Sequence, residues 1–274
     1  AFNTLWDDMK EINKIIKEKK NMISVEALSF KKGIFLKGIN FQYDGQKSKT
    51  ISNVTIKILK NSTVGFVGST GSGKTTIIDI ILGLLSPLSG EFLVDNKKIN
   101  RDNIHSWQKS IGYVPQQIYL TDDTIKANIA FGHNSNDIDM DRLKNAATLA
   151  NIHEFVDAKL PNKYETKIGE HGVRLSGGQR QRIGIARALY YDPEVLIFDE
   201  ATSALDNITE KKVMNAISSF GRKKTIILIA HRLSTVRKCD NIFIFEDGKL
   251  SGEGSYNHLL STNLQFQKMS NLNN

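Results

Sequence analysis

The chain has 274 residues, with 40% hydrophobic side chains, 24% charged side chains and a formal net charge of +8. This is an ordinary composition for a globular protein with a substantial core. No apolar run reaches the roughly 18 residues of a membrane-spanning helix, which excludes a membrane-spanning part within this stretch. The single cysteine, Cys239, cannot form an internal disulfide, so a reducing compartment is expected. The basic charge fits nucleic acid, an anionic membrane surface or phosphate ligands, and does not choose among them.

The first 20 residues predict a separate helix. Apolar side chains recur at helical spacing from Leu5 to Ile16, and the lysines that follow suit the negative end of a helix dipole. Because the chain begins with Ala1 rather than methionine, we interpret it as part of a longer protein, with a processed chain as the alternative.

From residue 34 the pattern alternates between strands and helices. Short apolar or alternating runs predict strands at 35–41, 51–58, 64–67, 195–198, 225–230 and 242–245. Helical patterns are expected at 77–85, across most of 121–175, and at 178–191 before Pro193. This alternation predicts an α/β fold with a mostly parallel sheet that is covered on both faces. The last dozen residues, rich in Asn, Ser and Gln, are expected to fray.

A glycine-rich loop follows the predicted strand 64–67 and precedes a helical run. It reads Gly68, Ser69, Thr70, Gly71, Ser72, Gly73, Lys74 and Thr75. The glycines let backbone N–H groups turn around phosphate oxygens, and the positive end of the new helix is aimed at the same anion. We expect Lys74 to reach the β- and γ-phosphates of a nucleoside triphosphate and Thr75 to offer its hydroxyl to Mg²⁺.

Two carboxylates follow the predicted strand 195–198. Asp199 is expected to hold Mg²⁺, directly or through water, and Glu200 is expected to orient or deprotonate the attacking water. Two acids after a strand are common in proteins, so this interpretation depends on the phosphate loop upstream.

A second predicted anion site opens the helix at 178–191. Its pentapeptide reads Leu175, Ser176, Gly177, Gly178 and Gln179. The Ser176 hydroxyl and the N–H groups of the two glycines would form another anion-binding helix N-terminus. One nucleotide cannot easily use both helix starts of the same chain. We therefore expect two chains to pair head to tail, each lending this pentapeptide to the other's ATP.

Together these motifs resemble the ATP-binding cassette (ABC) transporter ATPases over about residues 34–262. The resemblance implies a P-loop NTPase core with a mostly parallel sheet, an antiparallel β subdomain and an α-helical signature subdomain. It also implies that the domain binds ATP and Mg²⁺ and hydrolyses ATP.

The same resemblance implies further site residues. Tyr43 resembles the aromatic residue that stacks on adenine, and Thr76 adjoins Thr75 in the nucleotide site. Gln116 resembles a glutamine that senses Mg²⁺ and the membrane subunit, with Gln117 as a rival. Residues 203–206 resemble a loop that crosses the dimer interface, and His231 resembles a histidine that contacts the γ-phosphate. The expected catalytic residues are thus Lys74, Glu200 and His231, and the expected metal ligands are Thr75, Gln116 and Asp199.

Two stretches resemble the exporter branch of this family. Residues 124–132 follow the glutamine loop as in exporters, and residues 169–172 stand where exporters carry a loop that touches the membrane subunit. His171 stands where exporters usually have arginine, which weakens the inference that residues 169–172 contact a membrane subunit. The alternatives are an importer ATPase subunit, a soluble ABC ATPase and a catalytically silent module. No heptads and no second cassette appear, so no nucleic-acid partner is expected.

The resemblance divides the chain into three parts. Residues 1–30 are expected to be a linker and the end of a membrane-domain helix. Residues 31–265 form the expected nucleotide-binding domain, with a helical subdomain at about 121–190, and residues 266–274 form a tail. The expected partners are ATP, a second copy of this domain, and a transmembrane domain on the same full-length chain. The domain would then lie at the cytoplasmic face of the inner or plasma membrane. General similarity to flippase-type cassettes favours a lipid or lipid-linked glycan as cargo.

Overall fold

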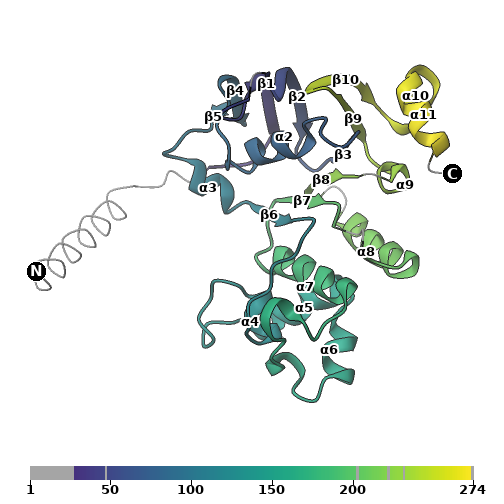
Figure 1. The fold of residues 1–274 in the computed structure, drawn as a ribbon. Coiled ribbons are helices and arrows are strands. Elements are labelled where there is room, and N and C mark those ends of the chain that lie inside the picture. Colours follow the sequence, from purple (N-terminus) through teal and green to yellow (C-terminus); the bar gives the residue numbers. More distant parts are fainter. Residues whose placement is uncertain (1–27, 47, 202–203, 221–222, 231, 273–274) are drawn as a thin grey trace, which may run out of the picture.

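The computed structural model describes residues 28–46, 48–201, 204–220, 223–230 and 232–272. Two sheets form the upper and middle parts of the molecule in Figure 1, and a lobe of helices lies below them. The helix predicted near the N-terminus falls outside the described residues.

An antiparallel sheet forms the upper part. It contains β1 (Gly33–Phe41), β2 (Ile51–Leu59), β4 (Ser89–Val94) and β5 (Lys97–Lys98) in the order β2-β1-β4-β5. From Val54 to Leu59, buried and exposed side chains alternate along β2, which is the period of a strand with one covered face. The covered face lies against α2, as Figure 1 shows.

The central sheet has six strands in the order β10-β9-β3-β8-β7-β6. They are β3 (Thr63–Gly68), β6 (Ile111–Val114), β7 (Val195–Asp199), β8 (Thr225–Ile229), β9 (Asn241–Glu246) and β10 (Lys249–Gly254). Five of them run parallel, and β10 joins the edge antiparallel to β9. Every residue of β7 and β8 is buried, as expected for parallel strands with both faces covered.

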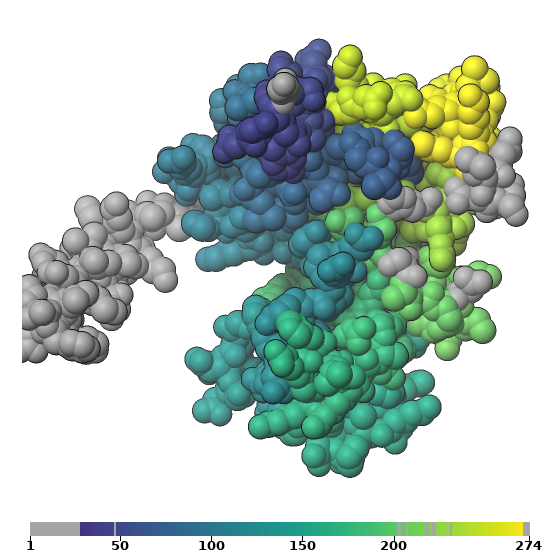
Figure 2. Space-filling view, viewed as in Figure 1, coloured from purple at the N-terminus to yellow at the C-terminus, as the bar shows by residue number. Residues whose placement is uncertain are grey.

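The helices cover the central sheet on both faces. They are α2 (Lys74–Ile81), α3 (Ile104–Gln108), α4 (Ile125–Ile129), α5 (Met140–Leu149), α6 (His153–Lys159), α7 (Gly177–Tyr190), α8 (Asn207–Ser219), α9 (Leu233–Val236), α10 (Tyr256–Thr262) and α11 (Leu264–Leu272). One core joins the antiparallel sheet, α2 and one face of the central sheet, and it includes Ile197 and Ile227. Trp107 of α3 belongs to this core as well. The other core joins the opposite face to helices α4 to α11, and it includes Leu196 and Ile226. Figure 2 shows the helical lobe as a distinct mass below the sheets.

The segment that leads into β1 is anchored to the end of α2. Phe30 is 2% exposed, and its ring lies 5.8 Å from that of Trp107 between centroids. The indole Nε1 of Trp107 donates a 2.6 Å hydrogen bond to the carbonyl of Ile81, the last residue of α2. The carboxylate of Asp95 accepts hydrogen bonds from the backbone of the following residues, including one of 2.9 Å from Gly33. These contacts fix where the chain enters the domain.

The fold class predicted from the sequence is confirmed. The predicted strands and the helix at 178–191 appear within a few residues of their expected bounds. The C-terminal residues differ from expectation, because α11 occupies a stretch that was expected to fray and most of the predicted tail. Phe266 is 0% exposed, and its ring packs on Tyr256 at 5.3 Å between centroids. Phe266 and the partly buried Met269 are the apolar core contacts of this mostly polar stretch, and two such positions are too few to establish a helical periodicity.

This packing predicts unequal effects of two alanine substitutions in α11. Phe266→Ala empties a fully buried site and should lower the free energy of unfolding by about 3–5 kcal/mol. Leu264→Ala is the matched control, because Leu264 is 74% exposed and its truncation should change stability by less than about 0.5 kcal/mol. Denaturant titration followed by circular dichroism measures both. Equal effects would mean that α11 does not pack on the domain in solution.

Candidate functional site

The glycine-rich loop joins the end of β3 to the start of α2. Gly73 stands directly before the first residue of α2 with a φ of 99°, a backbone conformation that favours glycine. A Cβ at Gly73 would lie 2.5 Å from Cδ1 of Ile51, and one at Gly68 would lie 2.3 Å from the carbonyl oxygen of Phe245. These contacts explain why both positions carry glycine. The loop therefore wraps closely around the N-terminus of α2, as the motif predicts.

Lys74 is the first residue of α2 and is only 5% exposed. Its Nζ donates hydrogen bonds of 2.9 Å to the Gly68 carbonyl and 2.8 Å to the Ser69 carbonyl. Burial lowers the pKa of Lys74, while the charges of Glu200 and Asp199 act in the opposite direction. The ammonium group thus lies inside the loop and within electrostatic reach of both carboxylates.

The other loop residues line an open mouth. Ser69, Thr70, Gly71 and Thr75 are exposed, whereas the side chain of Ser72 is 2% exposed. The Tyr43 hydroxyl lies 3.2 Å from Oγ1 of Thr76, which places this aromatic ring beside the first turn of α2. Tyr43 remains 37% exposed, so its ring is accessible to a ligand. The sequence-predicted residues of the phosphate loop and Tyr43 therefore lie together.

The two predicted carboxylates stand at the end of β7. Asp199 is 7% exposed, and its Oδ2 accepts a hydrogen bond of 3.4 Å from the hydroxyl of Tyr113 on β6. Burial raises the pKa of Asp199, and the charge of Glu200 raises it further. Burial and the charge of Asp199 also raise the pKa of Tyr113, which keeps this phenol a hydrogen-bond donor. A divalent cation bound here would offset the crowding of negative charge.

Glu200 adopts an uncommon backbone conformation, with a φ of 49°. The side chain amide of Gln116 donates a 2.9 Å hydrogen bond to Oε2 of Glu200. Such positive φ values in residues other than glycine persist where the surrounding structure enforces them, often at functional sites. Gln116, Glu200, Asp199 and Lys74 thus form one cluster at the carboxyl ends of β3, β6 and β7.

The donor set fits Mg²⁺, a hard cation that prefers oxygen ligands and keeps several waters. Asp199 supplies a carboxylate, and Thr75 supplies an exposed hydroxyl on the first turn of α2. Gln116 could add its amide oxygen. No group of three or more histidine, cysteine, aspartate or glutamate side chains forms a cation cage among the described residues. A site with few protein ligands is the usual arrangement for Mg²⁺ bound with a nucleotide.

The pentapeptide at 175–179 begins α7 with reciprocal capping. Oγ of Ser176 accepts a 3.2 Å hydrogen bond from the backbone of Gln179, whose side chain oxygen accepts a 2.8 Å bond from the backbone of Ser176. Ser176 is exposed, and Gly177 and Gly178 are half-buried. The helix start is therefore rigid and open to solvent.

The pentapeptide packs against the predicted interface-crossing loop. A Cβ on Gly177 would lie 3.7 Å from Cβ of Ala204, and one on Gly178 would lie 3.3 Å from the Ala204 carbonyl oxygen. Oε1 of Gln181 accepts a 3.1 Å hydrogen bond from the Ala204 backbone. Asp206 then caps α8 by accepting bonds from the backbone of residues 208 and 209. Residues 204–206 are thus held between the starts of α7 and α8.

The two predicted anion sites belong to different parts of the chain. Figure 1 shows α2 beside the antiparallel sheet and α7 in the helical lobe, with β6 and β7 between them. Among the described residues, Ser176 forms no hydrogen bond with the phosphate loop. His231, the predicted γ-phosphate contact, lies outside the described residues, as do positions 202 and 203.

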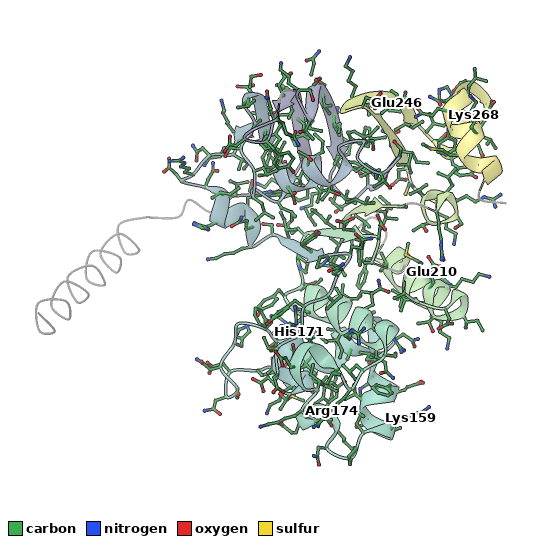
Figure 3. All side chains as sticks on the ribbon, in the orientation of Figure 1. Lys159, His171, Arg174, Glu210, Glu246 and Lys268 are labelled. Atoms are coloured by element: carbon green, nitrogen blue, oxygen red, sulfur yellow. The ribbon has the colours of Figure 1, made fainter. Side chains whose placement is uncertain are left out.

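The start of the first exporter-like stretch, residues 124–132, lies beside the segment that leads into the second, residues 169–172. Ile125 donates a backbone hydrogen bond to Thr166, and Ile168 donates one to Asp123. The rings of Tyr119 and His171 meet at 5.2 Å between centroids. Figure 3 shows His171 and Arg174 in this lobe.

Sequence reasoning missed a polar pair formed by the buried Asn128 of the first stretch and the half-buried Arg187 of α7. Asn128 is 0% exposed, and Nε of Arg187 on α7 donates a 2.8 Å bond to its carbonyl. Another nitrogen of Arg187 donates a 2.9 Å bond to the Tyr119 carbonyl. Nothing in the sequence distinguishes Arg187 from other helix arginines. This pair ties the segment after Gln116 to the helix that the pentapeptide begins.

Comparisons with known proteins agree with this geometry. A family model described as "ABC transporter" matches residues 51–203. The chain is 43% identical over 236 residues to an ATP-dependent lipid A-core flippase of Saccharophagus degradans, covering 86% of this chain and 40% of that protein. It is 38% identical over 258 residues to a putative export ATP-binding/permease protein of Rickettsia bellii, covering 94% of this chain and 41% of that protein.

A solved structure of an ABC exporter is also similar to this chain. A bacterial Atm1-family ABC exporter with ATP bound superposes with a TM-score of 0.84 at 34% identity, covering 90% of this chain and 42% of that one. The chain thus spans about two fifths of the length of these relatives.

The fold and the phosphate loop define a P-loop nucleoside triphosphatase. The chain belongs to the ATP-hydrolysing domains of the ABC transporter family. In the described part of the chain, no helix is both long and apolar enough to cross a bilayer.

The position of Lys74 predicts a loss of ATP affinity on its removal. Charge-assisted hydrogen bonds contribute about 1.5–3 kcal/mol, so Lys74→Ala should weaken ATP binding by roughly tenfold to a hundredfold. Calorimetric titration with ATP measures this change. Lys159→Ala is the control, because Lys159 is exposed on α6 in the helical lobe (Figure 3), whereas α2 lies beside the antiparallel sheet (Figure 1). Unchanged affinity in Lys74→Ala would contradict the proposed cradle.

Proposed function

We propose that this chain is the ATP-driven motor domain of a membrane exporter and that it works as a head-to-tail pair. The observation that carries the proposal is the presence of two helix starts suited to phosphate in separate parts of one chain, at α2 and at α7. The relatives are a flippase and a putative export protein, and the structural neighbour is an exporter. The importer and silent-module alternatives gain no support from any contact described above.

The proposed hydrolytic roles follow from the cluster at the strand ends. Lys74 would turn from the carbonyls of Gly68 and Ser69 to the β- and γ-phosphates, exchanging neutral acceptors for charged ones. Glu200 would orient the attacking water, and its bond from Gln116 would hold the carboxylate toward the γ-phosphate. Tyr43 would stack on adenine beside Thr76.

Mg²⁺, when bound by Asp199 and Thr75, would neutralise charge on the phosphate oxygens. Tyr113 would steady the Asp199 carboxylate through its hydroxyl. Gln116 donates its bond to Glu200 through the amide nitrogen, so its amide oxygen could take the predicted place near the metal while that bond stays in place. The side chain would then connect the metal, the carboxylate of Glu200 and the segment that follows Gln116.

The proposed pairing completes each site with the partner's signature pentapeptide. Ser176, Gly177, Gly178 and Gln179 form a rigid, solvent-open helix start that can accept a γ-phosphate from outside its own chain. Residues 204–206, packed on that start, would lie at the interface. His231 would contact the γ-phosphate of the chain's own nucleotide. ATP would favour the closed pair because it touches both chains, and its hydrolysis would release them.

The proposed membrane contact uses the exporter-like stretches. Tyr119, Phe131 and Val173 are 62%, 49% and 75% exposed, so this lobe presents large apolar side chains to solvent. Such exposed groups are typical of protein contacts when they gather on one face. Arg187 would pass movement of this face to α7 and its pentapeptide.

We further propose that the membrane part lies on the same full-length chain and that the domain works at the cytoplasmic face of the inner or plasma membrane. The relatives are more than twice as long as the part matched here. A lipid or lipid-linked glycan is the favoured cargo, because a named relative is a lipid A-core flippase.

Glu200→Gln tests the hydrolytic role. Glutamine keeps an oxygen that can accept the bond from Gln116, yet it cannot take a proton, so phosphate release should fall by about a hundredfold or more. ATP should still bind, and size-exclusion chromatography with ATP and Mg²⁺ should show a stable dimer.

Glu154→Gln, an exposed change on α6, is the matched control and should release phosphate at the parent rate. Parent-like turnover in Glu200→Gln would remove Glu200 from the mechanism. A variant that binds ATP but stays monomeric would remove the pairing instead.

A further inference from the structure

A groove separates α8 from α9 and from the loop that follows α9. Its volume is about 830 Å³, which lies within the range of small-molecule sites. Side chains from α8, β8, α9, the first residue of β3 and three connecting segments line it. None of the lining residues belongs to the phosphate loop, the carboxylate pair or the pentapeptide. The groove is therefore separate from the proposed nucleotide site.

The floor of the groove is apolar. Met214 and Ile217 contribute from α8, and Ile226 and Leu228 contribute from β8. The thiol of Cys239 completes the floor, and burial raises its pKa to about 12, so it carries no charge at neutral pH. Moving a hydrocarbon group from water onto this floor would be favourable, because the floor contains no charged group that the hydrocarbon would bury without a partner.

The rim of the groove is basic on both sides. Lys211 stands on α8, and Arg237 and Lys238 stand at the end of α9. All three are exposed, and within the described ranges none forms an ion pair. Such exposed cations are accessible to an anionic ligand.

The other charged groups of the rim are Arg232, Glu210 and Asp240, and Arg237 itself lies 5.8 Å from the ring centroid of Tyr256. Arg232 forms a 3.4 Å ion pair with Glu210, which Figure 3 labels at the end of α8 nearest the central sheet. Asp240 accepts a 2.7 Å hydrogen bond from the backbone of Thr63. The rim thus holds four cationic side chains, from Lys211, Arg232, Arg237 and Lys238, against the two carboxylates of Glu210 and Asp240, and this excess of positive charge favours an anionic ligand.

We propose that this groove binds a single-chain anionic amphiphile. Its hydrocarbon part would lie on the floor formed by Met214, Ile217, Ile226 and Leu228, and its anionic head group would lie among Lys211, Arg237 and Lys238. Together, the floor and the rim select an anionic amphiphile, because the floor favours a hydrocarbon chain and the rim repels a cationic head group. This proposal goes beyond ATP hydrolysis, and its test does not depend on that activity.

Decyl phosphate, used below its micelle concentration, is the probe for this site. Calorimetric titration of the 274-residue chain should show saturable binding. Decyl maltoside and decyltrimethylammonium carry the same hydrocarbon chain with neutral and cationic head groups, and each should bind at least about tenfold more weakly. Equal affinity for the three probes, or no saturable binding of decyl phosphate, would overturn the proposal.

Methionine-methyl NMR locates the bound probe. The Met214 resonance should shift on addition of decyl phosphate, whereas that of Met140, on α5 outside the groove, should stay in place. A shift at Met140 without one at Met214 would place the probe elsewhere and overturn the assignment.

Two variants separate the contributions of rim and floor. Arg237→Glu combined with Lys238→Glu should weaken decyl phosphate binding by about tenfold or more, because the head group would meet like charge. Lys159→Glu combined with Lys268→Glu is the matched control, since both lysines are exposed, outside the groove and labelled in Figure 3. This control changes the net charge equally and should bind like the parent chain.

Met214→Trp fills the floor and should weaken all three probes, with thermal unfolding used to confirm that the variant is folded. Because Met214 is half-buried, the exposed rim variants provide the test if Met214→Trp does not fold. If the rim variant and its charge-matched control lose equal affinity for decyl phosphate, binding depends on the net charge of the protein alone, and the proposed site is overturned.

Discussion

The buried ammonium group of Lys74 sets the arrangement of the residues around it. A cation removed from water is unfavourable unless oxygen atoms surround it, and here the carbonyls of Gly68 and Ser69 supply them. The charges of Asp199 and Glu200 also favour the protonated lysine. This compensation requires β3 and β7 to end at the same edge of the sheet. Their parallel pairing through β8 meets that requirement.

The same parallel strands require cover on both faces, and this requirement explains the division of the molecule. Neighbouring residues such as Leu196 and Ile197 belong to different cores, so each strand links the antiparallel sheet to the helical lobe. The ends of these strands then carry the polar residues that the interior cannot accept. The candidate site is thus a consequence of where the buried strands stop.

The phosphate loop and the central strands could be predicted from the sequence because their causes are local. A positive φ favours glycine, as at Gly73, and a buried strand requires a continuous apolar run. Both requirements can be recognised in the sequence. The contact of Gln181 with Ala204 and that of Arg187 with Asn128 join residues distant in sequence, and no spacing rule reveals them. The roles of the site residues stay predictions, because the structure shows which residues lie close together but not what each one does during ATP hydrolysis.

The anchoring of Phe30 has a mechanical consequence. Its ring rests on Trp107, and Trp107 is bonded to the last carbonyl of α2. Lys74 stands at the opposite end of that same short helix. A tension applied to the polypeptide ahead of Phe30 would be shared between Trp107, which is bonded to α2, and the carboxylate of Asp95, which holds the backbone of residues 32 and 33. Phe30, where the chain enters the domain, is therefore connected through Trp107 and the short helix α2 to Lys74, the lysine expected to bind phosphate.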